Sequence, residues 1–396
     1  MMNLKNTVAA PAPKKNFSWN NPATRAIVYQ VLAVALVGGV GWYMVHNTLH
    51  NLSVRNITTG FDFLTREAGF AIGEGLITFT PADTYQRAIT VGVLNTLRVA
   101  LCGILFATIL GTIIGIARLS KNWLVRTVAS VYVEVMRNIP LLLQLFFWYV
   151  IIIETMPGPR KAFHPLAGVF ISNRGIQIPS VHGEGLTWLL VGLLLAVLLS
   201  LTLRVWARRR QDQTGKIFAL GRSTLVLLLV TPALAWWLSG TQMSLDVPEL
   251  KGFNFAGGLT LSPEFAALLF GLVIYTSAFI AEVVRSGIQS VDRGQWEAAG
   301  ALGIKNSLVL RLVVLPQALR VIIPPMTSQY LNITKNSSLA VAIGYPDLVS
   351  VINTTLNQTG QAIEGILMIM AAYLTVSLSI SFFMNWYNKR IALVER

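Results

Sequence analysis

Long apolar runs separated by shorter polar segments set the pattern of this chain. A helix needs roughly 20 apolar residues to cross a bilayer core of about 30 Å, and by that measure the sequence predicts eight spans. They cover residues 26–45, 95–117, 131–153, 186–206, 224–237, 265–284, 319–343 and 366–384. The fifth is short and the seventh is polar, but both are needed if the basic segments are to face one side. The pattern therefore predicts an all-α, polytopic membrane protein.

Composition supports the membrane class. Hydrophobic residues make up 54% of the 396 positions and charged residues only 12%, which is more apolar surface than one water-soluble core can bury. The net charge of +14 is compatible with nucleic-acid binding, but most of the 31 lysines and arginines lie on alternate segments between the spans. By the positive-inside rule these segments and both termini are cytoplasmic. Membrane orientation explains the charge, so no nucleic-acid partner is expected.

A basic, proline-containing stretch precedes the first span, as in a signal peptide. It carries Lys14, Lys15 and Arg25, but the apolar run that follows is long and no small-x-small cleavage site comes after Met44. We therefore expect an uncleaved anchor helix.

Side chains that bind metals or nucleotides are sparse. The single cysteine, Cys102, lies inside a span, so internal disulfides and thiolate metal sites are excluded. Only Gly215 and Lys216 match part of a phosphate-binding loop, since Arg210 stands where that motif has glycine and Ile217 where it has Ser or Thr. We expect no catalytic site, metal or cofactor in this chain, so any ATP is hydrolysed elsewhere.

The charged segment 292–316, between the sixth and seventh spans, predicts two helices joined by a sharp turn. Asp292 and Gln295 have the spacing of an N-terminal capping box, and an Ala- and Leu-rich run follows them. Gly303 can end this helix in the left-handed conformation, and Asn306 can cap a second helix that leads back to the membrane.

The same segment carries an extended motif. It reads Glu-Ala-Ala, three residues, Gly, nine residues, a β-branched residue, any residue, Leu and Pro. The matching positions are Glu297, Ala298, Ala299, Gly303, Val313, Leu315 and Pro316. The spacing resembles the cytoplasmic loop of ABC importer permeases, with Val313 where Ile is usual. The resemblance implies that these residues and Gln295 form a coupling helix region that docks on an ATPase; a surface hairpin without a partner is the alternative.

Further segments resemble the polar amino-acid uptake branch of these permeases. They include Asn95-Thr-Leu-Arg98, the run from Tyr132 to Gln144, and the run from Ala278 to Gly287. The match covers residues 88–155 and 264–390, and it leaves out the anchor helix and roughly residues 156–260. A permease enlarged in this way resembles the long-chain type of general L-amino-acid ABC transporters, which works beside a second, different permease.

The resemblance implies a type I ABC importer permease fold with extra N-terminal and inserted helices. We expect a cytoplasmic N-terminus, anchor and first periplasmic loop in 1–87, core segments in 88–155 and 261–396, and two extra spans in 156–260. The implied partners are a dimeric ATPase that binds ATP and Mg, a second permease, a periplasmic solute-binding protein and membrane lipid. The implied location is the bacterial inner membrane.

The seventh span is unusually polar and is the candidate solute path. Its polar positions are Gln329, Tyr330, Asn332, Lys335, Asn336, Ser337 and Ser338. A charge near the bilayer centre costs about 2.5 to 3.5 kcal/mol, so Lys335 should face a cavity or a partner. It either binds the carboxylate of a zwitterion or pairs structurally with a carboxylate such as Glu282 or Glu154; the sequence leaves both open.

Two further alternatives stay open. Gly111 and Gly115 form a small-xxx-small pair that lets another helix approach closely, or they are merely tolerated in a membrane helix. For the function, an ion-coupled secondary transporter with Lys335 and Glu282 as relay groups is the alternative, although no internal repeat is visible. A membrane scaffold without transport is a weaker rival, and both explain the segment 292–316 poorly.

Overall fold

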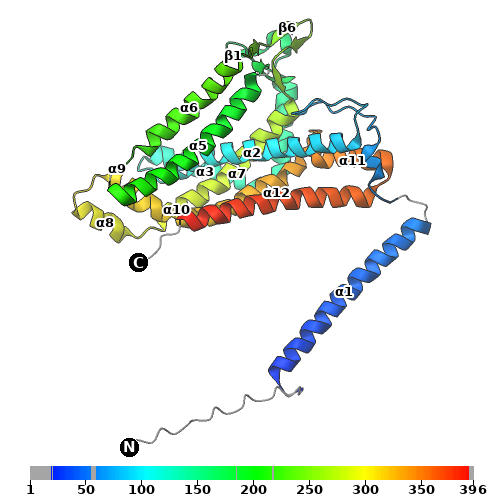
Figure 1. The fold of residues 1–396 in the computed structure, drawn as a ribbon, viewed down its shortest axis with the longest axis horizontal. Coiled ribbons are helices and arrows are strands. Elements are labelled where there is room, and N and C mark those ends of the chain that lie inside the picture. The colour runs from blue at the N-terminus through cyan, green and yellow to red at the C-terminus, as the bar shows by residue number, and fades with distance from the viewer. Residues whose placement is uncertain (1–18, 20, 55–58, 184, 216–217, 392–396) are drawn as a thin grey trace, which may run out of the picture.

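The computed structural model describes every residue except 1–18, 20, 55–58, 184, 216–217 and 392–396. Within this described part the chain is mainly helical (Figure 1), with seven helices long and apolar enough to cross a membrane, or eight if one bent pair counts as a span. The long helices are α1 (Pro22–Val54), α2 (Tyr85–Ala117), α5 (Gly185–Thr214), α6 (Leu220–Ser239), α7 (Pro263–Gln289), α10 (Leu315–Asn336) and α12 (Ala362–Ile391).

Shorter elements complete the helical part. The α-helices are α3 (Trp123–Asn138), α4 (Leu141–Val150), α8 (Arg293–Ala301), α9 (Asn306–Val309) and α11 (Leu348–Thr359). The 3₁₀ and π turns are η1 (Asp62–Thr65), η2 (Ile151–Thr155), η3 (Pro159–Lys161), η4 (Leu310–Val314) and η5 (Ser337–Ile343).

Helix α7 is the centre of the core, because α2, α3, α4 and α10 all pack against it. Its contact with α2 depends on the glycine pair. A Cβ on Gly111 would lie 2.6 Å from the Cβ of Ile280, and one on Gly115 would lie 2.8 Å from the carbonyl oxygen of Ala281. Such distances are too short for a side chain, so the two glycines let the helix backbones approach closely.

The third span differs from the continuous helix predicted over 131–153. It consists of α3 and the α4–η2 segment, which meet at an angle of 104°. Pro140 has no N–H and disfavours helical geometry before it, and Ile139 is extended. The Gln144 side chain donates to the carbonyl oxygens of Met136 and Ile139, at 2.9 and 3.0 Å, and so satisfies carbonyls at the break.

Residues 156–261 contain short strands, which the sequence pattern did not predict, as well as helices α5 and α6. The strands are β1 (Phe163–Leu166), β2 (Val169–Ser172), β3 (Gly175–Ile178), β4 (Ser180–His182), β5 (Ser244–Asp246), β6 (Glu249–Lys251), β7 (Asn254–Ala256) and β8 (Leu259–Leu261). They form an antiparallel sheet in the order β1-β2-β3-β8 and the two pairs β4-β5 and β6-β7. The fold is thus mainly helical with a small β strap.

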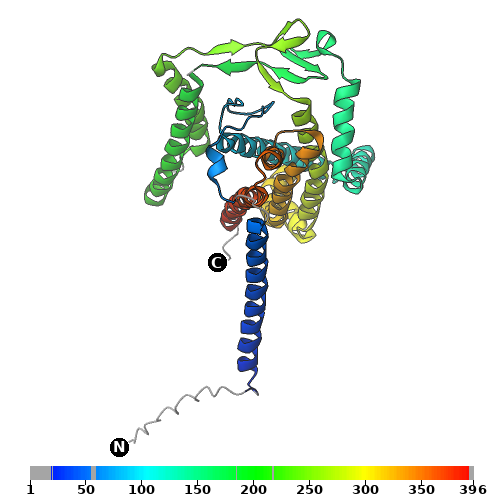
Figure 2. The same ribbon diagram turned by 90° about the vertical axis from the view of Figure 1, so that its right-hand side faces the viewer.

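The strap connects the core to the hairpin of α5 and α6, which lies to one side in Figure 2. These two helices pack mainly on each other, and a Cβ on Gly192 would lie 2.6 Å from the Cα of Pro232. Helix α1 also stands apart from the core, and almost all of its described side chains are exposed (Figure 1).

Candidate functional site

The segment 292–316 folds as a compact elbow between α7 and α10. Asp292 caps α8, its carboxylate accepting from the Gly294 N–H at 2.6 Å. Gly303 has a φ of +69°, which confirms the predicted left-handed turn. The N–H of Gly303 donates to the Gly300 carbonyl, and the N–H of Ile304 donates to the Ala299 carbonyl. This is the Schellman pattern, in which the helix ends sharply.

The second arm of the elbow begins at Asn306, whose side chain lies outside the described residues, so its predicted capping role stays a prediction. This arm runs through α9 and η4 into α10, and residues Ser307–Ile343 form one helical stretch that is long and apolar enough to include a membrane span. At η4 the Leu315 N–H donates to the Leu310 carbonyl. This wider turn comes just before Pro316, which has no N–H to offer. The elbow and the polar span are therefore mechanically continuous.

One face of the elbow belongs to the protein core. Ala299 is 5% exposed and shares a hydrophobic cluster with Val309 and Val314, against which Trp296 and Ile304 also pack. The same cluster continues into α7 and α10. The elbow is thus held to the membrane helices by apolar packing as well as by the chain itself.

The other face is exposed and apolar at its tip. The exposed motif positions are Gln295, Glu297, Ala298, Gly303, Leu315 and Pro316. Beside them, Leu302 is 78% exposed, and Leu312 and Leu308 are also exposed. The sequence motif did not point to these leucines. The sequence feature that could have identified them is a large apolar side chain in an otherwise charged cytoplasmic segment. Of the predicted coupling positions, Ala299 faces inward and Val313 is half-buried.

A cluster of three charged side chains joins α2 to α7 directly before the elbow. Glu282 on α7 pairs with Arg118, which follows α2, and with Arg285 one turn further along α7. Arg285 in turn donates to Gln289 at 2.6 Å. Glu282 is therefore committed to two arginines. Within the described chain, no ion pair joins Lys335 to Glu282 or Glu154.

The polar positions of the seventh span divide between two faces of α10. Ser328, Asn332 and Lys335 are exposed and recur every three or four residues, so they form one polar face. Tyr330 lies on the opposite side, where its hydroxyl accepts from Thr108 of α2 at 3.0 Å.

The remaining candidates lie at the edges of this polar face or behind it. Gln329, Asn336 and Ser338 are half-buried, whereas Ser337 is buried and donates to the Thr334 carbonyl at 2.7 Å. The polar face therefore consists of Ser328, Asn332 and Lys335, and only the last two belong to the predicted set.

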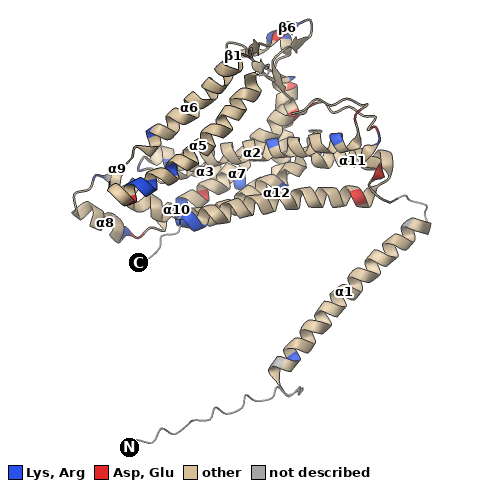
Figure 3. Ribbon diagram, in the orientation of Figure 1, with Lys and Arg blue, Asp and Glu red and all other residues tan. Residues whose placement is uncertain are grey.

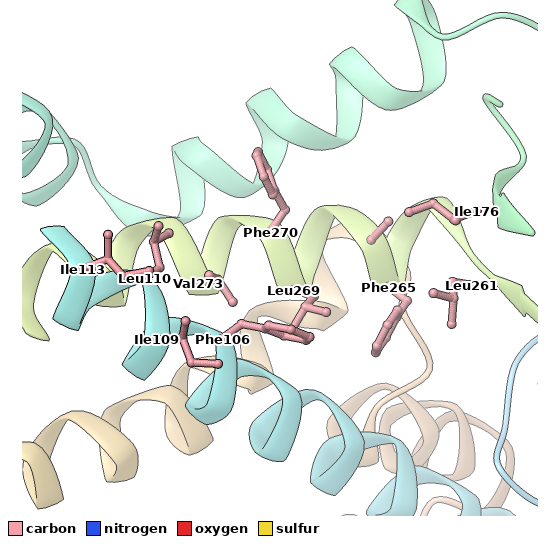
Figure 4. A pocket seen from close by; sticks show the side chains of 11 residues that line it. Phe106, Ile109, Leu110, Ile113, Ile176, Leu261, Phe265, Leu269, Phe270 and Val273 are labelled. Atoms are coloured by element: carbon pink, nitrogen blue, oxygen red, sulfur yellow. The ribbon is translucent and has the colours of Figure 1, made fainter. Parts of the chain in front are cut away.

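The apolar groove beside the strap is a poor site for a polar solute. The groove in Figure 4 has a volume of about 390 Å³ and lies along α2 and α7, with Ile176 of β3 and Leu261 of β8 at one end. Its lining consists of Phe106, Ile109, Leu110, Ile113, Ile176, Leu261, Phe265, Ala266, Leu269, Phe270 and Val273. None of these side chains can hydrogen-bond a zwitterion, so this groove fits apolar groups. The described residues contain no cluster of three or more His, Cys, Asp or Glu that could hold a metal.

The family model described as binding-protein-dependent transport system inner membrane component matches residues 103–393. The chain is 53% identical to the putative amino-acid ABC transporter permease protein YhdX of Escherichia coli K12, over 97% of this chain and 98% of that one. It is 48% identical to the general L-amino acid transport system permease protein AapQ of Rhizobium johnstonii, over 95% and 94% of the two chains.

A third relative is the glutamate/glutamine/aspartate/asparagine transport system permease protein BztB of Rhodobacter capsulatus. It is 42% identical over 98% of this chain and all of that one. These similarities extend over the anchor helix and the inserted region as well as the core.

Proposed function

This chain belongs to the family of binding-protein-dependent transport system inner membrane components, and we propose that it serves as the permease of an ATP-driven importer of amino acids. The names of its three relatives, all amino-acid permeases by name, support this substrate class. The chain itself is a membrane subunit and not an ATPase; ATP and Mg are bound by a partner ATPase dimer. A periplasmic solute-binding protein and a second, different permease complete the importer.

The observation that carries the proposal is the continuity between the elbow and the polar face of α10. When the ATPase changes state, the docked elbow moves, and its second arm transmits that movement to α10 without a break. Coupling requires that the elbow make different contacts in the two ATPase states. The exposed leucines and Glu297 supply these contacts.

The solute path lies along the polar face of α10. Lys335 attracts the carboxylate of the amino acid, while Asn332 and Ser328 hydrogen-bond its other polar groups. This face is exposed in the single chain, and a charge is costly against lipid. The second permease therefore covers it and completes the path. Gln329, Asn336 and Ser338 lie at its edges, whereas Tyr330 and Ser337 support it from behind.

The charge distribution supports a bacterial inner-membrane location with the elbow in the cytoplasm. In Figure 3 many lysines and arginines gather toward the end of the molecule that carries α8, the end of α5 and the end of α12. By the positive-inside rule this end is cytoplasmic, and the strap and α11 face the periplasm.

Site-specific crosslinking tests the partner. In a Cys102→Ser background, a photoreactive cysteine probe at Leu302 should crosslink to the co-expressed ATPase in membranes, with a yield that changes when ATP is added. The matched control is the same probe at Phe253, which is 76% exposed on the strap and should not reach the ATPase. Absence of any ATPase adduct from Leu302, with intact complex on a native gel, would contradict docking of the elbow.

Reconstitution separates the importer from its rival. Vesicles that contain this chain, the second permease and the ATPase should take up amino acid only with ATP and the binding protein. Uptake driven by an ion gradient without nucleotide would favour the secondary transporter. The pairing of Glu282 with two arginines already disfavours a relay between Glu282 and Lys335.

A further inference from the structure

A long groove runs along the side of α10 that lies opposite its polar face. Helices α2 and α12 both pack on α10 but are not packed against each other, so a channel remains between them. Two cavities of about 780 and 420 Å³ lie in this channel. Both are lined by Tyr330, Phe383 and Met384, so they adjoin at these side chains and together form one groove. Helix α10 contributes only Tyr330 to the larger cavity but much of the lining of the smaller one.

The groove has the length of a membrane-spanning helix. Its α2 wall extends from Val93 to Ile116, which corresponds to about 35 Å at 1.5 Å per residue. This matches the thickness of the bilayer core. The walls are mainly apolar, and two of the polar groups inside, the hydroxyls of Thr108 and Tyr330, are already bonded to each other. The occupant is therefore a long apolar object and not the solute.

Helix α1 is attached beside one end of this groove. The N–H of Gly60 donates to the Glu364 carboxylate at 2.8 Å, and Glu364 lies in the first turn of α12. Only residues 55–59 separate Gly60 from the end of α1 at Val54. Helix α1 has 33 residues and α12 has 30, and the chain leaves α1 and enters α12 at this same end. If α1 lies against α12, the two helices are therefore antiparallel and similar in length.

The facing surfaces suit close helix packing. The α12 wall presents small side chains at Ala371, Thr375 and Ser379, one every four residues. Near its middle α1 carries Ala35, Gly38 and Gly39, and a Cβ on either glycine would meet nothing within 4 Å. In lipid, helices associate by the close packing that small residues permit, because burial from water supplies no driving force there.

We propose that α1 docks in the groove between α2 and α12, antiparallel to α12, when the protein is assembled in a membrane. The exposed apolar surface of α1 then packs on a matching wall, and the groove is closed by a segment of the same chain. The docked helix braces α2 and α12 around the back of α10 and keeps lipid away from it. The polar face of α10 stays free, so this arrangement is independent of the proposed solute path.

A distance measurement between α1 and α12 tests the docking. In a Cys102→Ser background, spin labels are placed at Gly39→Cys and Ser379→Cys, which the antiparallel alignment brings to similar depth. In nanodiscs that contain the assembled transporter, strong dipolar broadening is expected, because packed helices lie about 8 to 10 Å apart. The matched control is Gly39→Cys with Leu374→Cys, since Leu374 is exposed on α12 but does not line the groove. This pair should show weaker broadening.

Dilution with unlabelled chain distinguishes docking of α1 within one chain from the other possible occupants of the groove. Diluting the doubly labelled chain with unlabelled chain leaves an intramolecular signal unchanged. Loss of the signal on dilution would mean that α1 docks on another copy, and no broadening at any dilution would mean that lipid or the second permease fills the groove. Either result overturns the proposal. A disulfide formed by oxidation of the Gly39→Cys and Ser379→Cys pair within a single chain, identified by its linked peptide, would support it independently.

Discussion

The guanidinium of Arg98 lies 2.6 Å from the carboxylate of Glu74, and both side chains are only 10% exposed. Arg98 is on α2, whereas Glu74 belongs to the loop that precedes it. Arg98 also stacks over the ring of Phe265 at the start of α7, 4.1 Å from its centroid. Next to this pair, the Asn95 amide donates to the carbonyls of Glu74 and Pro346, at 2.8 and 2.9 Å. These contacts attach the first loop and the segment before α11 to the core helices.

Breaking this buried pair on one side should be more harmful than removing both charges. Arg98→Met leaves the Glu74 carboxylate buried and unpaired, and Glu74→Gln does the same to Arg98. Each single substitution should cost about 3 to 5 kcal/mol of folding free energy, and the double variant should cost less than either single variant. Thermal unfolding in detergent of the two single variants and the double variant measures this coupling. Additive losses would show that the two charges do not stabilise each other.

A side chain at Gly303 should disturb the elbow without preventing insertion. Nothing lies within 4 Å of a Cβ there, so the cost comes from the φ of +69°, which a β-branched residue strongly disfavours. Gly303→Val should therefore reach the membrane in normal amounts but lose at least tenfold in ATP-driven uptake. The matched control is Gly300→Ala, because Gly300 lies inside α8 and also has open space around it. Uptake and ATPase rates of the two variants measure the loss of coupling. Normal coupled uptake by Gly303→Val would contradict the predicted role of the turn.

The parts of the fold that the sequence predicted are those with strong local signals. Apolar runs of membrane length identified the long helices, and Gly303 identified the turn because its conformation needs glycine. The break of the third span was visible as Pro140, but residues 131–153 together have the length of a membrane span and so suggested one helix. The strands of the strap have only three or four residues each, which is too short for a periodic pattern to emerge.

The division of α10 into two faces depends on tertiary packing. Tyr330 and Asn332 are two residues apart and both can form hydrogen bonds, yet α2 supplies a hydroxyl partner to Tyr330, whereas Asn332 is exposed. Position along a helix can predict that these side chains point apart, but it cannot predict which side faces the rest of the protein. For the same reason, the sequence allows an ion pair between Glu282 and Lys335, whereas in the structure Glu282 pairs with Arg118 and Arg285.

Removing the charge of Lys335 should weaken transport without affecting folding. In the proposed path, the exposed ammonium group of Lys335 would form charge-assisted hydrogen bonds to the solute carboxylate, each of about 1.5 to 3 kcal/mol. Lys335→Met should therefore reduce the apparent affinity for amino acid by at least tenfold, while expression and ATPase activity without solute stay normal. Lys121→Met serves as control, since Lys121 is exposed in the segment between α2 and α3. Unchanged uptake kinetics for Lys335→Met would remove this residue from the path.

Asp347 should make the stability of the protein fall as pH rises. Its side chain is 1% exposed and caps α11 by accepting from the Ser350 N–H at 2.9 Å. Burial raises the pKa of this carboxyl from its ordinary value of 3.8 to about 6, although hydrogen bonds from neighbouring backbone N–H groups oppose the shift. The folded state therefore holds the proton more tightly than the unfolded chain.

The sign of the effect follows from proton linkage. Between about pH 4 and pH 6 the folded state binds more protons than the unfolded state, so stability decreases with rising pH in this window and is constant above it. A shift of this size corresponds to about 2 to 3 kcal/mol.

The Asp347→Asn variant keeps a capping oxygen but cannot ionise. Its melting temperature should therefore not fall between pH 4 and pH 6, and at pH 7 it should exceed that of the unmodified protein. Thermal unfolding from pH 4 to pH 8 measures both. Asp83→Asn is the control: Asp83 accepts from the Thr80 N–H, which lowers its pKa, so its removal should leave the decrease in place. A decrease of the same size in Asp347→Asn would assign the pH dependence to another group.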